Sequence, residues 1–212
     1  MNFNALTFDR DILSRKGADA CGMIYYAGSD RIADARVKNF IRAGSEDFVT
    51  GDGIYLPSLF ASDDETDAAI DGIFSGAEII LSVCATLDEV GTCDKKYGMT
   101  PIGLAHKYGL LCDQTYIAGG VYLDKDDIDL IIQSGAKVIL TPSDSMGNGC
   151  GIPPLRMLAG LGATVRLGTG TGKYNREADL AFESHLIYLA ASGMLCTPSP
   201  VTDEFMKKLI AM

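Results

Sequence analysis

The chain has 212 residues, of which 47% are hydrophobic, and this length suits one domain with a sizeable core better than two small domains. Its net charge of −10 and isoelectric point of about 4.6 argue against nucleic acid and anionic membranes as partners, because like charges repel. No apolar run approaches the ~20 residues of a membrane-spanning helix, and the first residues lack the basic and apolar regions of a secretory signal. We therefore expect a cytoplasmic protein in which residues 1–212 form a single α/β domain.

Seven strands are predicted along the chain. A pattern of Gly-Ala, one residue, Ile or Val, one residue and Leu begins at Gly76, Gly135 and Gly162. In each copy, a glycine that tolerates positive φ ends a helix and an apolar β-rich run follows at once. Apolar strands that are buried on both faces are typical of parallel sheets. The predicted strands, in chain order, are residues 21–27, 47–50, 54–59, 76–81, 115–121, 135–140 and 162–167.

The segments between these strands begin with helix-capping residues. Ser62–Glu65 has the pattern of a capping box, and Thr100 precedes Pro101 at the first helical position. Asp124 and Thr202 can cap two later helices. The alternation of helices and strands predicts α/β architecture with right-handed crossovers. Periodicity alone leaves open whether the sheet closes into a barrel or stays open.

In both architectures, ligands bind at the carboxyl ends of the strands. The residues that follow the predicted strands are mostly small or hydroxylated and include no histidine. The chain has two histidines, His106 and His185, and both fall within predicted helices. The candidate pocket residues are Asp30, Asp52, Ser82, Gly119, Thr141, Ser143, Thr169 and Gly170, and the candidates for chemistry are Cys84, Asp144 and Lys173.

The sequence offers poor material for a metal site. Zinc needs a cluster of His, Cys or carboxylate ligands, and nothing in the sequence brings Cys84 and Cys150 together. Asp30, Asp52 and Asp144 could supply oxygen ligands to Mg²⁺, although loop carboxylates are commoner than magnesium ligands. The six cysteines include no C-x-x-C pair, so we expect reduced thiols. We predict no metal and no other cofactor.

The stretch RLGTGTGKY at residues 166–174 has the glycine content of a phosphate-binding loop. A Walker A loop needs a glycine five residues before Gly172 and a Ser or Thr after Lys173. The chain has Leu167 and Tyr174 at those positions, so the match fails twice. A backbone nest formed by its glycines, with the lysine beside it, could still hold an anion.

Several stretches from Ile79 to Leu189 carry a resemblance to a known family. They read ILSVCATLDEV, KYGMTPIGLAHKYGLL, YIAGGVYLDKDDIDLIIQSGAKVILTPSDSMGNGCGIPPLRMLAGLGATVRLGTG and ADLAFESHLIYLAA. In their order and spacing the chain resembles the metal-dependent amidohydrolase superfamily, in particular its adenosine-type deaminases and triazine chlorohydrolases. The resemblance implies a TIM-like (β/α)₈ barrel. It also implies that the chain begins after the family's first strand and lacks the family's β-sandwich, so we expect an incomplete barrel of about seven strands.

The resemblance also locates the family's metal and acid–base positions, from which this chain departs. The His-x-His pair of the first strand has no counterpart. Ser82 stands for a metal histidine and Ala85 for a catalytic glutamate after the fifth strand, and Gly119 stands for a histidine after the sixth. Leu140 begins the segment that reads H-C-P-T-S-N in the family, and Gly170 stands for the aspartate of the eighth strand. The resemblance thus implies a truncated, degenerate member without metal ligands.

Three interpretations of function remain. The first is a non-catalytic relative that binds a small molecule or an anion, or acts as a scaffold, as a homo-oligomer. We favour it because Gly, Ser and Ala do not coordinate a metal that could activate water. The second is a metal-independent hydrolase that uses Cys84, Asp144 or Lys173, although a thiol needs a neighbouring base or cation to become nucleophilic. The third is a subunit whose active site is completed by a partner chain that supplies the missing strand.

Overall fold

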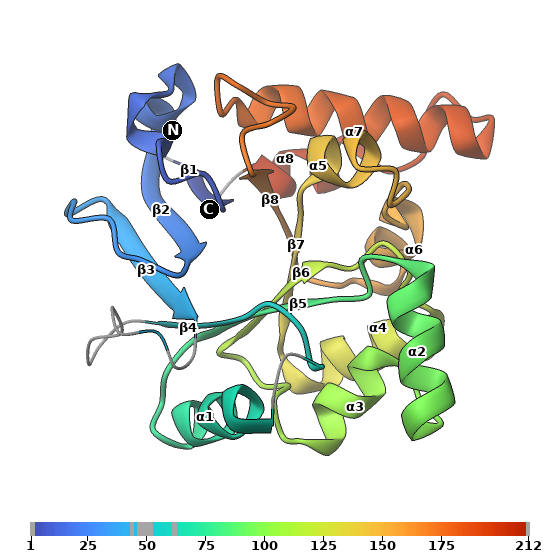
Figure 1. Cartoon of the computed structure of the whole chain (residues 1–212). Coiled ribbons are helices and arrows are strands. Elements are labelled where there is room, and N and C mark those ends of the chain that lie inside the picture. The colour runs from blue at the N-terminus through green and yellow to red at the C-terminus, as the bar shows by residue number, and fades with distance from the viewer. Residues whose placement is uncertain (1–2, 43–44, 46–52, 61–62, 211–212) are drawn as a thin grey trace.

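Eight parallel strands form a closed barrel in which they pair in chain order. The computed structural model describes residues 3–42, 45, 53–60 and 63–210. In Figure 1 the strands succeed one another around a central axis, with their carboxyl ends toward the viewer. The strands are β1 (Phe3–Thr7), β2 (Cys21–Gly28), β3 (Val37–Arg42), β4 (Gly53–Leu56), β5 (Ile79–Val83), β6 (Thr115–Gly119), β7 (Lys137–Leu140) and β8 (Val165–Gly170).

The barrel confirms the predicted fold class, but the expectation of a missing first strand is wrong. Strand β1 pairs with β2 on one side and with β8 on the other. It has only five residues, and its partner β8 lies far along the chain, so no local pattern reveals it. Strand β3 was also missed, because Lys38 and Arg42 interrupt the continuous apolar run expected of a doubly buried strand. The predicted strand at residues 47–50 lies outside the described residues.

The helices carry the caps that the sequence predicts where these residues are described. Thr100 accepts a hydrogen bond from the Gly103 amide, and Asp124 forms a reciprocal capping box with Asp127. The predicted capping box at Ser62–Glu65 lies partly outside the described residues. The helices are α1 (Asp63–Phe74), α2 (Leu87–Tyr97), α3 (Pro101–Lys107), α4 (Lys125–Ser134), α5 (Pro142–Gly147), α6 (Leu155–Leu161), α7 (Leu180–Leu195) and α8 (Asp203–Ile210).

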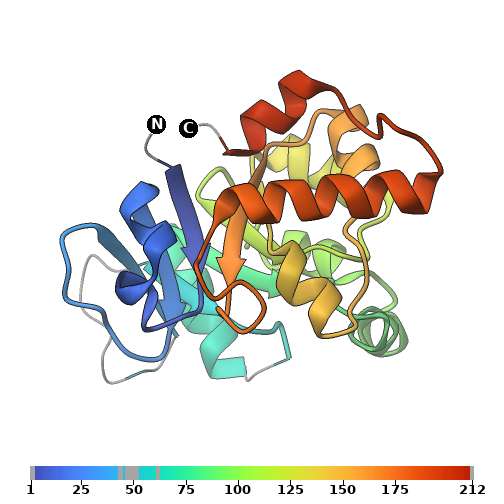
Figure 2. The same ribbon diagram turned by 90° about the horizontal axis from the view of Figure 1, so that it is seen from above.

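The two halves of the barrel have different connections. From β4 onward, every strand is followed by at least one α-helix, and Figure 2 shows the long helix α7 lying along the outside of the barrel. Strands β1 and β2 are joined instead by two 3₁₀ turns, Ile12–Ser14 and Lys16–Ala20. The residues between β2 and β3 form no helix. The first half is therefore held by strand pairing and loops more than by helix packing.

Two apolar clusters form the core. The smaller cluster fills the barrel interior and includes Leu6, Phe40, Ile80, Tyr116 and Ile139. The larger cluster lies between the outer face of the strands and the surrounding helices, as expected for this architecture. None of the helices in the described ranges is long and apolar enough to cross a membrane.

Candidate functional site

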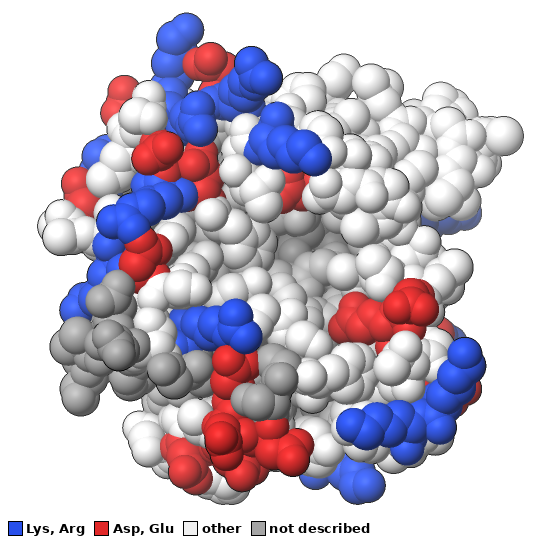
Figure 3. All heavy atoms as spheres, in the orientation of Figure 1, with Lys and Arg blue, Asp and Glu red and all other residues white. Residues whose placement is uncertain are grey.

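The face formed by the carboxyl ends of the strands is hollowed near its centre (Figure 3). The surface around the hollow is largely uncharged, whereas Lys, Arg, Asp and Glu gather toward the rim. Ligands bind at this face of a (β/α)₈ barrel because the loops after all the strands converge there. The hollow is therefore the candidate ligand site.

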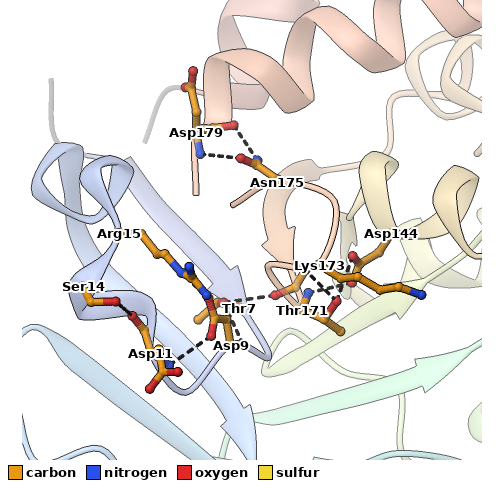
Figure 4. Close-up of polar contacts among 11 residues, drawn as sticks. Thr7, Asp9, Asp11, Ser14, Arg15, Asp144, Thr171, Lys173, Asn175 and Asp179 are labelled. Carbon is orange, nitrogen blue, oxygen red and sulfur yellow. Dashed lines mark hydrogen bonds and ion pairs between the residues drawn. The ribbon is translucent and has the colours of Figure 1, made fainter. Parts of the chain in front are cut away.

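Asp144 and the loop after β8 make a close polar contact (Figure 4). The Thr171 amide donates to Asp144 Oδ2 at 2.6 Å, and the Thr171 hydroxyl donates to Oδ1 at 3.0 Å. Gly170 has a φ of 64°, and a Cβ at this position would lie 2.3 Å from Asp144 Oδ2. The Asp144 carboxylate thus fills the space that a side chain at position 170 would need. It reaches this space from α5, the helix after β7, and not from β8.

A second carboxylate, Asp9, lies against the same loop. Arg15 Nε donates to Asp9 Oδ2 at 2.9 Å, and a Cβ on Gly172 would lie 2.5 Å from that oxygen. Two carboxylates therefore flank this loop, and the Thr171 amide is already bonded to Asp144. The arrangement disfavours an anion in the loop, because the neighbouring negative charges would repel it. Sequence reasoning missed Asp9 because its strand was not predicted.

Ser143 is bonded to a buried glutamate of α7. Glu183 accepts from the Ser143 amide at 2.8 Å, from the Ser143 hydroxyl at 2.5 Å and from the Asn175 side-chain amide at 2.8 Å. Burial raises the pKa of Glu183, and these hydrogen bonds oppose the rise. Ser143 therefore ties α5 to α7. Sequence reasoning missed Glu183, although its position as the single carboxylate of a long apolar helix was an available signal.

The ends of β5 and β6 bring Ser82, Cys84 and Gly119 together, with Val83 paired to Gly119. Burial raises the pKa of Tyr55, and the nearby Ser82 side chain opposes the rise. Cys84 is buried, and burial raises the pKa of its thiol, so the thiol stays protonated at neutral pH. Gly119 has a φ of 99°, and a Cβ there would lie 2.8 Å from the Val83 carbonyl oxygen. A histidine at position 119 does not fit this backbone.

Two of the three aspartates considered as magnesium ligands, Asp30 and Asp144, are described by the structure, and each is bonded to different residues. Asp30 accepts from the Tyr26 hydroxyl at 2.9 Å and forms an ion pair with Arg10. Asp144 is bonded to the loop after β8 instead. Asp52 lies outside the described residues. Asp30 and Asp144 therefore have separate structural partners.

The remaining candidates do not form a reactive group with these residues. Thr141 and Thr169 are buried, and the Thr169 hydroxyl has no hydrogen-bond partner in the described part of the chain. Lys173 is exposed, and its Nζ lies 4.7 Å from the ring centroid of Tyr174. None of these three side chains provides a base close to the Cys84 thiol, whose raised pKa has burial as its largest cause.

The described residues do not form a binding site for the catalytic zinc that the resemblance implies. Among them, no group of three or more His, Cys, Asp or Glu side chains is arranged to hold a metal ion. The two histidines of the chain are exposed on α3 and α7, away from the strand ends. Zinc in a catalytic site typically takes three protein ligands, most of them imidazoles.

The chain is similar in sequence and in fold to known deaminases. No family model matches it. A 5-methylthioadenosine/S-adenosylhomocysteine deaminase from Caldicellulosiruptor saccharolyticus is 30% identical over 131 residues, which are 62% of this chain and 30% of that protein. A deaminase of the same name from Pyrococcus furiosus is 32% identical over 131 residues, again 62% of this chain and 31% of that protein. An adenosine deaminase from Xanthomonas campestris, solved with bound zinc, has a TM-score of 0.63 at 17% identity, over 78% of this chain and 35% of that one.

The curated deaminases and the solved structures support a relationship of the chain to the amidohydrolase superfamily. The resemblance read from its sequence is thereby confirmed at the level of the superfamily. The chain spans less than a third of the length of the two curated relatives.

Proposed function

We propose that this chain is a deaminase-related barrel that binds a small molecule at the carboxyl ends of its strands and does not deaminate it. The observation that carries the proposal is the set of residues at those strand ends. Ser82, Gly119 and Gly170 stand where the resemblance leads us to expect two histidines and an aspartate. The two histidines of the chain lie on helices.

The local geometry supports this proposal. A catalytic zinc lowers the pKa of its bound water and thereby supplies the nucleophile for hydrolysis. At Gly119, the Val83 carbonyl oxygen leaves no room for a side chain. At Gly170, the space is taken by Asp144, whose two oxygens are both bonded to Thr171. Gly119 and Gly170 have no side chain that could bind a metal, and a side chain introduced at either position would clash with its neighbours.

The ligand class follows from the relatives and from two aromatic rings. The names of the relatives indicate action on adenine nucleosides that carry a thioether. In this chain Phe8 follows β1 and Tyr55 lies in β4, with ring centroids 5.6 Å apart, and both side chains are half-buried. Aromatic rings stack favourably on purine bases. We infer that the hollow binds an adenine nucleoside.

The test measures binding and turnover separately. Calorimetry with 5′-methylthioadenosine and S-adenosylhomocysteine should detect binding, while the same samples release no ammonia with or without added Zn²⁺. Phe8→Ala should weaken binding about tenfold through lost stacking. Phe182→Ala, which removes an exposed ring on α7, is the matched control and should have no effect. Ammonia release that a chelator abolishes would overturn the non-catalytic proposal, and failure to bind either nucleoside would refute the ligand class.

The other two interpretations have less support. A Cys84 nucleophile is disfavoured because burial raises the pKa of its thiol. A partner chain is not needed to supply a strand, because β1 of the same chain closes the barrel. A homo-oligomer stays a prediction, and light scattering on the purified chain tests it.

A further inference from the structure

The opposite end of the barrel holds a second cavity. It lies at the amino ends of the strands and has a volume of about 210 Å³, which is room for roughly seven water molecules. Strands β1, β2, β6, β7 and β8 contribute its walls. The residues that line it are Leu6, Tyr25, Tyr116, Lys137, Ile139, Arg166 and Leu167.

The charge around this cavity is opposite in sign to that of the whole chain. Lys137 and Arg166 line the cavity, and Lys38 Nζ lies 6.0 Å from the ring centroid of Tyr25, another of the lining residues. Among the described residues, the carboxylate bonded to this group is Glu78, which pairs with Lys38 and accepts from the Tyr116 hydroxyl at 3.1 Å. Three cations and one carboxylate leave an excess of two positive charges, in a chain whose net charge is −10.

The two cations that line the cavity lack an acidic partner in the described part of the chain. Lys137 Nζ donates to the backbone carbonyl of Asp113 and lies 5.1 Å from the ring centroid of Tyr116. Arg166 Nη1 donates to the carbonyl of Val165 at 3.0 Å. A guanidinium has five N–H donors and an ammonium three, so most of their donors remain available. Partly buried cations without a counter-ion are costly, and a bound anion would offset that cost.

We propose that this cavity binds a compact oxyanion of the phosphate type between Lys137 and Arg166. The parallel N–H groups of a guanidinium match two oxygens of such an anion. The apolar walls formed by Leu6, Ile139 and Leu167 lower the local dielectric constant and thereby strengthen the attraction between the cations and an anion. The volume admits inorganic phosphate or a group of similar size. None of the residues that line this cavity is among those on which the proposed nucleoside site rests, so the two proposals stand independently.

The experiment is a titration of the 212-residue chain with inorganic phosphate at constant ionic strength. We expect saturable broadening of the ³¹P resonance and a saturable rise in the unfolding temperature. Arg166→Gln and Lys137→Gln should each weaken the apparent affinity about tenfold or more. Lys95→Gln removes an exposed cation of α2 and is the matched control for the change in net charge, with little expected effect.

The outcomes decide between an anion site and a purely structural cluster. A response that is the same in the wild type, Arg166→Gln and Lys137→Gln would overturn the proposal, as would a response no larger than that to added chloride. If Arg166→Gln does not fold, the titration of the wild type and of Lys137→Gln still decides the question. Loss of the response in both variants, with retention in Lys95→Gln, would support the site.

Discussion

The pairing of β5 with β6 and the pairing of β1 with β8 differ in how they are built. The pairing of β5 with β6 extends over five residue pairs. Along the chain, an α-helix precedes and follows each of these two strands. The pairing of β1 with β8 has two residue pairs, Leu6↔Gly168 and Thr7↔Gly170, and we call it the seam. Hydrogen bonds supplement the seam, since the Thr7 hydroxyl and the Phe8 amide donate to the Gly170 carbonyl at 3.1 and 2.9 Å. The closure of the barrel therefore depends on the same loop that borders the candidate site.

The largest effect is expected from a carboxylate introduced at the seam. Gly170→Asp places a side chain at a φ of 64° and 2.3 Å from Asp144 Oδ2. We expect a loss of about 4 kcal/mol of unfolding free energy from backbone strain, steric overlap and charge repulsion. Urea unfolding measures this loss.

Gly76→Asp is the matched control for Gly170→Asp. Gly76 has a φ of 84°, but no atom lies within 4 Å of its added Cβ, so only the backbone cost of about 1 kcal/mol remains. The double variant Asp144→Gly/Gly170→Asp should recover much of the stability lost in Gly170→Asp. Equal losses in Gly170→Asp and Gly76→Asp would show that Asp144 does not occupy the space beside Gly170.

A smaller loss is expected within the second half of the barrel. Glu183→Gln turns one accepting oxygen into a donor that faces the donors of Ser143 and Asn175. We expect a loss of about 2 kcal/mol, whereas Glu177→Gln, at an exposed position, should change stability little. Equal stability of the two variants in urea unfolding would contradict the role given to Glu183.

Because Glu183 is buried, we also expect the free energy of unfolding to depend on pH. Burial raises its folded-state pKa above 4.5, so folding favours the protonated form. The stabilising contribution is therefore present below the unfolded-state pKa and is lost as pH rises through the folded-state pKa. The stability of the wild type relative to Glu183→Gln should decrease from pH 4.5 toward neutrality. An increase over that interval would show that the hydrogen bonds, and not burial, dominate the pKa.

The smallest loss of stability is expected when one hydroxyl is removed from the seam. Thr7→Val loses the bond to the Gly170 carbonyl and the acceptor for the Asp9 amide, which should cost about 1.5 kcal/mol. Thr115→Val is the counterpart in the second half, where the hydroxyl donates to the Leu110 carbonyl at 2.6 Å. Hydrogen exchange should accelerate selectively in β1 and β8 for Thr7→Val. A uniform acceleration over all strands would mean that the seam is no weaker than the rest.

The sequence predicted the second half of the barrel better than the first for a physical reason. At Gly135 and Gly162, a helix ends in the left-handed conformation and an apolar strand follows, so the signal is local. Strand β1 depends on pairing with β8, which no local pattern reveals. The sequence also predicted which residues follow the strands. It did not predict their contacts, because Asp144 and Thr171 are far apart in the sequence and come together only in the folded barrel.

Zinc content after metal loading tests whether the carboxyl ends of the strands hold a catalytic metal. The purified chain is incubated with Zn²⁺, freed of unbound metal by gel filtration, and analysed for zinc per chain by mass spectrometry. We predict well below one equivalent, because the described strand ends present no cluster of three ligands. One zinc retained per chain, removed by a chelator together with deaminase activity, would contradict this prediction.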